Sequence, residues 1–131
     1  MLVKMESNSN SGGSFSEKDL WINEQGTAIG DTTVPLYDSI DKYDYIRFDY
    51  KLKGHADVYS SIYPSAMAQE ANGFTNQPVC GISGYYSSSP YIRFGVFSTL
   101  SSCHFTVPYQ INGTSTGTND TIIPMKVVGL K

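Results

Sequence analysis

The chain has 131 residues and a mass of 14.4 kDa, a size typical of a single domain with one core. Charged residues make up only 16% of the sequence, whereas tyrosine, phenylalanine and glycine are abundant, a composition that favours an all-β fold. The net charge is -3 and no run of lysine or arginine occurs, which argues against nucleic acid and anionic membranes as partners bound through phosphate contacts.

The N-terminal segment is rich in serine, asparagine and glycine (SNSNSGGSFS at residues 7–16) and has almost no apolar side chains to bury. This composition is typical of a linker, so we expect residues 1–17 to form a flexible arm and residues 18–131 to form a β-sandwich head domain. The first residues lack the apolar centre of a secretory signal, and no apolar stretch of about 18 residues follows. The sequence therefore predicts a protein made in the cytoplasm, without a signal peptide or membrane insertion.

The first half of the body predicts an edge strand followed by a hairpin. Pro35 interrupts an apolar run at residues 32–37, as in an edge strand or a β-bulge. Apolar and polar side chains alternate from residue 43 to residue 53, which indicates a strand with one apolar and one solvated face. A turn at 53–57 then leads into a second strand at 58–63, and the two strands close a hairpin.

The second half predicts one short helix and further short strands, which are expected at 78–83, 91–97, 103–109 and 122–130. In the second of these strands, Ile92, Phe94 and Val96 share one face. Residues 64–72 begin with proline, contain helix-forming residues and are the only helix candidate. Residues 84–90 (GYYSSSP) are expected to form a turn-rich loop. Seven or eight short strands fit an all-β, single-domain β-sandwich or jelly roll.

Neither cysteine nor histidine spacing indicates a metal or cofactor site. Cys80 and Cys103 are too far apart for a CxxC motif and lack further ligands, so the sequence predicts two free thiols. A disulfide would form only if the two strands were neighbours. His55 and Asp57 would face the same side of a strand and could supply two metal ligands, but a third ligand is not identifiable. We therefore expect no metal and no cofactor.

Catalytic constellations are not recognisable in the sequence. The available acids Asp49, Asp57 and Glu70 show no spacing that marks the paired carboxylates of a glycoside hydrolase. His55 or His104 could be combined with one of the many serines, but no G-x-S-x-G nucleophile elbow accompanies them. The sequence therefore predicts a protein that is not an enzyme.

Tyrosines form the first candidate ligand surface. A tyrosine ring can stack on the C–H face of a sugar while its hydroxyl forms a hydrogen bond. Tyr59 and Tyr63 are four residues apart and share a face of a strand, Asp57 is at the next alternate position, and His55 is nearby. The alternative is that Tyr59 and Tyr63 pack in the core or across a trimer interface.

The second candidate ligand surface is the pair Tyr85 and Tyr86. Adjacent aromatic residues in a loop cannot both point inward, so at least one should be exposed and available for binding. The alternative is a turn in which one ring covers the edge of the sandwich. Arg47 and Arg93 are expected to pair with Asp49 or with a neighbouring subunit rather than to hold a ligand.

Motifs at both ends of the body are similar to those of a known group of proteins. The stretches concerned are Leu20-Trp21-Ile22-Asn23, Thr33-Val34-Pro35-Leu36, Tyr43-Asp44-Tyr45-Ile46, Tyr50-Lys51 and the ending Ile123-Pro124-Met125-Lys126-Val127-Val128-Gly129-Leu130-Lys131. They resemble the opening LWTNP…TV.L…YD.I…YK and the ending IPYKIYGIK of small tail-fibre or baseplate receptor-binding-type domains of phages and prophages of Gram-positive gut bacteria. The resemblance spans residues 20–131. It departs from the pattern at Asn23-Glu24, which replaces Asn-Pro, and in insertions between Gly54 and Ser89.

The resemblance implies an all-β head domain of a phage tail or baseplate, located in the virion and assembled as a homotrimer. Its expected partners are a host cell-surface polysaccharide and other virion tail proteins. One alternative is a structural virion adaptor or decoration protein that uses its aromatic surface for protein contacts. Another is a tail enzyme that degrades polysaccharide.

Overall fold

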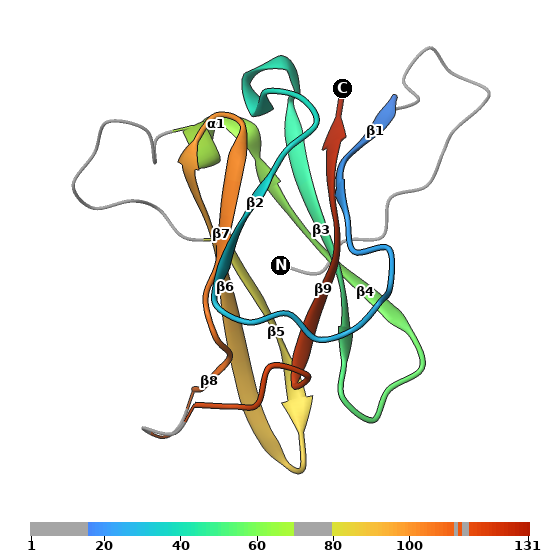
Figure 1. The fold of residues 1–131 in the computed structure, drawn as a ribbon, viewed down its shortest axis with the longest axis vertical. Helices are drawn as coiled ribbons and strands as arrows, with labels where there is room; N and C mark the ends of the chain where they lie inside the picture. The colour runs from blue at the N-terminus through green and yellow to red at the C-terminus, as the bar shows by residue number, and fades with distance from the viewer. Residues whose placement is uncertain (1–15, 70–79, 112, 114–115) are drawn as a thin grey trace.

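The computed structural model describes residues 16–69, 80–111, 113 and 116–131. Within these ranges the chain forms two antiparallel β-sheets that pack face to face, with one short α-helix at one end (Figure 1). The predicted all-β sandwich is therefore confirmed. Most of the predicted N-terminal arm, and the candidate acid Glu70, lie outside the described residues.

The first sheet joins strands from both ends of the sequence. Its strand order is β1 (Glu17–Ile22), β9 (Ile122–Leu130), β3 (Tyr45–Leu52) and β4 (Val58–Pro64). All neighbouring strands in this sheet are antiparallel. The direct pairing of β3 with β4 confirms the predicted hairpin and leaves β4 as an edge strand.

The second sheet has the strand order β2 (Thr32–Pro35), β7 (Ser102–Phe105), β6 (Ser89–Thr99) and β5 (Cys80–Tyr86), and β8 (Tyr109–Gln110) also pairs with β6. The strand that contains Pro35 is an edge strand, as the sequence predicts, because proline cannot donate to a second neighbour. A 3-10 helix, η1 (Ile40–Lys42), and the helix α1 (Ser65–Gln69) lie in the connections. The helix α1 confirms the helix expected within residues 64–72.

The connection between β5 and β6 is tighter than the sequence predicts. Ser87 and Ser88 both have positive φ angles, of 53° and 65°, and form a two-residue turn between paired strands. The ladder continues to the pair Tyr86–Ser89. The expectation of a loop over residues 84–90 is therefore wrong, and Tyr85 lies on the strand β5.

The middle of strand β6, residues 92–96, shows an inverted alternation of apolar and polar side chains. Ile92, Phe94 and Val96 share one face as predicted, but they are only half-buried, whereas Arg93 and Gly95 are buried between the sheets. Ile92, Phe94 and Val96 therefore lie on the outer face of the second sheet, whereas Phe97 of the same strand points into the core. The inward direction of Arg93 reverses the usual rule that a charged side chain points to solvent.

Arg93 is fully buried and binds main-chain carbonyl groups rather than a carboxylate. Its Nη1 donates to the carbonyl oxygens of Asn119 at 3.2 Å and Ile122 at 2.9 Å. Its Nη2 donates to those of Ile29 at 2.7 Å and Gly30 at 2.9 Å. The expectation that Arg93 pairs with Asp49 or a neighbouring subunit is therefore wrong. Arg93 instead fastens the segments before β2 and β9 onto β6.

Arg47 follows the sequence-based expectation. Its Nε donates to Asp49 Oδ1 at 2.8 Å, and its Nη1 lies 2.7 Å from Glu17 Oε1 on the outer face of the first sheet. Ser60 Oγ also donates to Asp49 Oδ1, at 2.7 Å. These contacts link β1, β3 and β4 across one face, so the outer surface of the first sheet carries ion pairs.

Phe48 on β3 lies at the centre of the core. The centroid of its ring is 5.8 Å from that of Phe97, 6.2 Å from that of Phe105 and 6.2 Å from that of Tyr63. Gly95 lies against the same ring, and a Cβ at this position would approach Phe48 Cε1 to 2.9 Å. The close packing of the two sheets therefore requires a glycine at this point of β6.

Cys80 and Cys103 are free and buried. They lie on β5 and β7, which β6 separates, so their strands are not neighbours. Two strand spacings place the Cα atoms roughly 10 Å apart or more, whereas a disulfide needs less than about 7 Å. Burial raises the pKa of Cys80 to about 12 and raises that of Cys103 well above its ordinary value. Both side chains are therefore neutral core residues at neutral pH.

Candidate functional site

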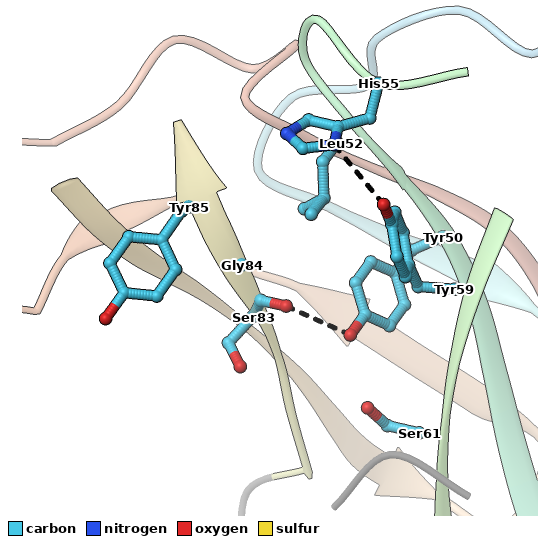
Figure 2. Close-up of a pocket in the computed structure, with 8 residues that line it drawn as sticks. All are labelled: Tyr50, Leu52, His55, Tyr59, Ser61, Ser83, Gly84 and Tyr85. Atoms are coloured by element: carbon cyan, nitrogen blue, oxygen red, sulfur yellow. Dashed lines mark hydrogen bonds between the residues drawn. The ribbon is translucent and has the colours of Figure 1, made fainter. Parts of the chain in front are cut away.

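A surface groove of about 410 Å³ lies where β4, at the edge of the first sheet, approaches β5, at the edge of the second. It combines aromatic rings with small polar side chains and is lined by Tyr50, Leu52, His55, Tyr59, Ser61, Ser83, Gly84 and Tyr85 (Figure 2). We call it the β4–β5 groove. Its residues come from three strands and from the turn between β3 and β4.

His55 and Tyr59 hold each other in place at one end of the β4–β5 groove. The turn before β4 contains Gly54, whose φ of 78° suits glycine, and it is closed by a hydrogen bond from the His55 amide to the Leu52 carbonyl, 3.0 Å long. The hydroxyl of Tyr59 lies 3.3 Å from His55 Nδ1. The two rings meet edge to face at 76°. This contact orients the Tyr59 ring against His55.

Two tyrosine hydroxyls connect the first sheet to the edge strand β5. Tyr50 donates to the carbonyl oxygen of Ser83 at 3.0 Å, and Tyr63 donates to that of Gly81 at 2.5 Å. Tyr50 is buried and forms the floor of the groove. Tyr63 does not line the groove, because its ring packs against Phe48, and burial raises the pKa of its hydroxyl. These hydrogen bonds satisfy carbonyl groups of β5 that the sheet leaves free.

Tyr85 lies on the other side of the groove floor from Tyr59. Figure 2 shows Tyr59 and His55 on one side of the Ser83–Gly84 backbone and the Tyr85 ring on the other. Gly84 faces the core, where an added Cβ would collide with the side chain of Leu52. The Tyr85 side chain is 65% exposed. The groove therefore has one fixed ring and one freely accessible ring.

The remaining predicted residues have other contacts. Asp57 is exposed and does not line the groove. The ring of Tyr86 lies 5.1 Å below Lys53 Nζ, which is also 3.3 Å from Asp120 Oδ2. The hydrogen bond and charge of Asp120 raise the pKa of Lys53. The groove lining itself contains no lysine, arginine, aspartate or glutamate.

The structure thus brings together His55, Tyr59 and Tyr85 from the predicted residues, and leaves Asp57, Tyr63 and Tyr86 outside. Sequence reasoning missed five lining residues, which are Tyr50, Leu52, Ser61, Ser83 and Gly84. Tyr50 and Leu52 belong to the predicted alternating strand, so the sequence predicts that their side chains point inward. It does not predict that they lie near β5, because that depends on how the two sheets pack.

The described ranges contain neither a cluster of metal-ligating side chains nor a membrane-length helix. Among those residues, no three histidine, cysteine, aspartate or glutamate side chains cluster as a metal site would require. None of the helices there has the length and apolar character of a membrane span. His104 lies on β7. Its Nδ1 is 2.8 Å from Thr33 Oγ1, and its Nε2 is 2.8 Å from Asp31 Oδ1. Its ring is therefore occupied by neighbouring side chains and does not contribute to the β4–β5 groove.

No protein-family model matches the sequence, and a search of curated proteins found no match.

Proposed function

We propose that this chain binds a neutral saccharide of a bacterial cell surface in the β4–β5 groove and acts without catalysis. The observation that carries this proposal is the pairing of two accessible tyrosine rings, Tyr59 and Tyr85, with serine hydroxyls in an uncharged lining. Sugar rings present C–H faces that pack on aromatic rings and hydroxyl groups that form hydrogen bonds. Ser83, His55 and the tyrosine hydroxyls provide such partners.

The size and position of the groove support a saccharide as ligand. Its volume of about 410 Å³ falls within the range of roughly 300–1,000 Å³ found for small-molecule sites. Because the groove lies at the edge of the sandwich, a longer glycan could extend beyond it in either direction. The lack of a basic side chain in the lining favours a neutral sugar over a phosphorylated or acidic one.

The sequence resemblance supports a place for this chain in a phage or prophage virion, as a tail or baseplate module. In this proposal the chain forms a homotrimer, contacts other tail proteins and needs no cofactor. Several copies would bind a repetitive host polysaccharide together, so a modest affinity per groove would give tight adsorption.

Binding to purified cell-wall polysaccharides of Gram-positive gut bacteria tests the proposal. Tyr85→Ala removes the exposed ring, and we expect the dissociation constant to rise roughly five- to tenfold, since one aromatic contact contributes about 1 kcal/mol. Tyr37→Ala is the matched control, because Tyr37 is 58% exposed and lies outside the groove. The proposal fails if no polysaccharide is retained by the natural chain, or if both variants bind equally well.

A structural virion adaptor or decoration protein is the second candidate, and the outward apolar side chains of β6 favour it. An adaptor would use this surface for protein contacts and would not need the β4–β5 groove. In phage particles, Tyr59→Ala combined with Tyr85→Ala would then leave host adsorption intact. Saccharide binding predicts lost adsorption by particles that still assemble.

A further inference from the structure

Strand β5 directs backbone N–H and C=O groups towards the β4–β5 groove at every second residue. The turn after β5 has two residues, so Tyr86 and Ser89, which flank it, form a hydrogen-bonded pair of the ladder. Such pairs alternate with pairs that are not hydrogen-bonded, and Tyr85 lies opposite Pro90, which has no N–H. The Pro90 carbonyl accepts from the Ile111 amide at 2.9 Å, on the other side of β6. The N–H and C=O of Tyr85 therefore point away from β6, towards the edge of the sheet.

Tyrosine hydroxyls occupy the carbonyl groups at the other outward positions of β5. The carbonyl oxygen of Gly81 accepts from Tyr63 at 2.5 Å, and that of Ser83 accepts from Tyr50 at 3.0 Å. Addition of a peptide strand to this edge would need successive carbonyl groups to be open. Among the described residues, no hydrogen bond occupies the outward carbonyl of Tyr85. The edge is therefore suited to one amide group rather than to an extended chain.

Ser61 places a second polar group on the opposite wall of the groove. Its side chain lies on β4, lines the groove and is only 4% exposed. Figure 2 shows its hydroxyl pointing from β4 towards β5, and it has no hydrogen-bond partner within the described part of the chain. A buried hydroxyl without a partner is costly, and a ligand can supply that partner. Ser61 thus indicates a polar ligand group held between β4 and β5.

Resting on the saccharide binding proposed above, we infer that the β4–β5 groove recognises the acetamido group of a neutral N-acetylated sugar. A trans amide directs its N–H and its C=O in opposite directions. It can therefore bridge the two walls, with one group on the backbone of Tyr85 and the other on the hydroxyl of Ser61, which both donates and accepts. The side chain of Leu52, which also lines the groove, offers an apolar contact for the acetyl methyl group.

A sugar with a hydroxyl in place of the acetamido group matches this arrangement less well. A hydroxyl carries its donor and its acceptor on one oxygen, so it does not span two walls as an amide does, and it brings no methyl group to Leu52. The polar groups of Tyr85 and Ser61 would then depend on water. Because the groove opens at the surface, water replaces part of the lost contact. We therefore expect a preference of about tenfold for the N-acetylated sugar, less than an enclosed site gives.

Chemical-shift titration of the natural chain with matched methyl glycosides tests the inference. The probes are the methyl glycosides of N-acetylglucosamine, N-acetylgalactosamine and N-acetylmannosamine, each compared with the glycoside of its parent hexose. The two members of a pair differ only in the acetamido group. We expect the dissociation constant of at least one N-acetylated member to be about tenfold lower than that of its parent, with the backbone amide of Tyr85 among the shifted signals.

Substitutions at two positions separate amide recognition from ring stacking. Tyr85→Ala removes the ring and keeps the N–H, so it should weaken both members of a pair equally. Tyr85→Pro also removes the outward N–H, which the ladder does not use, and should reduce the preference to roughly threefold or less. Ser61→Ala should reduce the preference to a similar extent. Ser98→Ala is the matched control, because Ser98 is an exposed strand residue outside the groove. Circular dichroism checks that each variant is folded.

Three results would overturn the inference. One is the absence of a preference, whether the pairs bind equally or not at all. Another is a preference that survives both Tyr85→Pro and Ser61→Ala. The third is binding of acetylated and amidated trialanine as tightly as the best glycoside, which would indicate a peptide partner. Retention of cell-wall polysaccharide is a separate readout, so a chain that retains polysaccharide without a preference contradicts this inference and leaves the proposed function standing.

Discussion

Replacing Arg93 with methionine tests whether the inverted strand β6 depends on its buried guanidinium. Methionine keeps a long, unbranched side chain but donates no hydrogen bond. The carbonyl oxygens of Ile29, Gly30, Asn119 and Ile122 would each lose their donor. Because these residues lie before β2 and before or at the start of β9, the segments that close one end of the sandwich would be released. We expect the free energy of unfolding to decrease.

The magnitude follows from two opposing effects. Hydrogen bonds from a charged donor contribute about 1.5–3 kcal/mol each, so four would give roughly 6–12 kcal/mol if nothing opposed them. Burial lowers the pKa of Arg93 from 12.5 to about 10, so keeping the positive charge inside costs roughly 3 kcal/mol. Subtracting this cost leaves roughly 3–9 kcal/mol, and we expect a loss at the lower end, about 3–5 kcal/mol, as found when one partner of a buried charged pair is removed. In a domain of this size, the loss lowers the melting temperature by roughly 10–20 °C.

Urea denaturation of the natural chain, Arg93→Met and Lys126→Met measures this difference. Lys126 is the matched control because it also lies on a strand, but its ion pair with Asp19 is on the outer face, where the two side chains are 41% and 40% exposed and such pairs contribute up to about 1 kcal/mol. Arg93→Lys should recover only part of the loss, since a single ammonium group cannot bridge both pairs of carbonyls. The reasoning is refuted if the free energy of unfolding of Arg93→Met lies within about 1 kcal/mol of that of Lys126→Met.

Two further predictions concern buried neutral groups. The pKa of the Cys80 thiol is raised from 9.0 to about 12 in the fold, so between these values the unfolded thiol loses its proton while the folded thiol keeps it. Stability is therefore fully present below pH 9 and falls as pH rises towards 12, by about 1.4 kcal/mol per pH unit. Urea midpoints at several alkaline pH values should decline less steeply in Cys80→Ala, and an unchanged slope would contradict the assignment. Tyr63→Phe keeps the ring against Phe48 but removes the hydrogen bond to Gly81, so we expect a loss of about 1–2 kcal/mol and faster amide exchange along β5. Tyr37→Phe, which changes an exposed hydroxyl, should have no measurable effect.

Local patterns in the sequence determined several strands correctly. Pro35 indicated an edge strand because its nitrogen cannot donate, and the period of two around Phe48 indicated a strand with one buried face. These features depend on the chemistry of adjacent residues alone. His55 and Tyr59 were identified for the same reason, since one turn and the start of one strand place them together.

Other features required the tertiary structure. The stretch Tyr85–Ser89 has the composition of a loop, yet two residues with positive φ suffice for the turn, and the pairing of β5 with β6 makes the rest strand. Tyr85 joins Tyr59 in one groove because the edges of two sheets meet there. No local pattern encodes that approach, which depends on contacts between residues far apart in the sequence.

Strand β6 shows most clearly which features the sequence determines and which the tertiary structure decides. The sequence alone determined that Ile92, Phe94 and Val96 share a face, because successive side chains of a strand alternate. It did not determine which face is buried, since a period of two is the same from either side. The fold decided that question by bringing four carbonyl groups from distant segments around Arg93 and by packing Phe48 against Gly95. Those contacts turn the arginine inward and leave three apolar side chains on the surface.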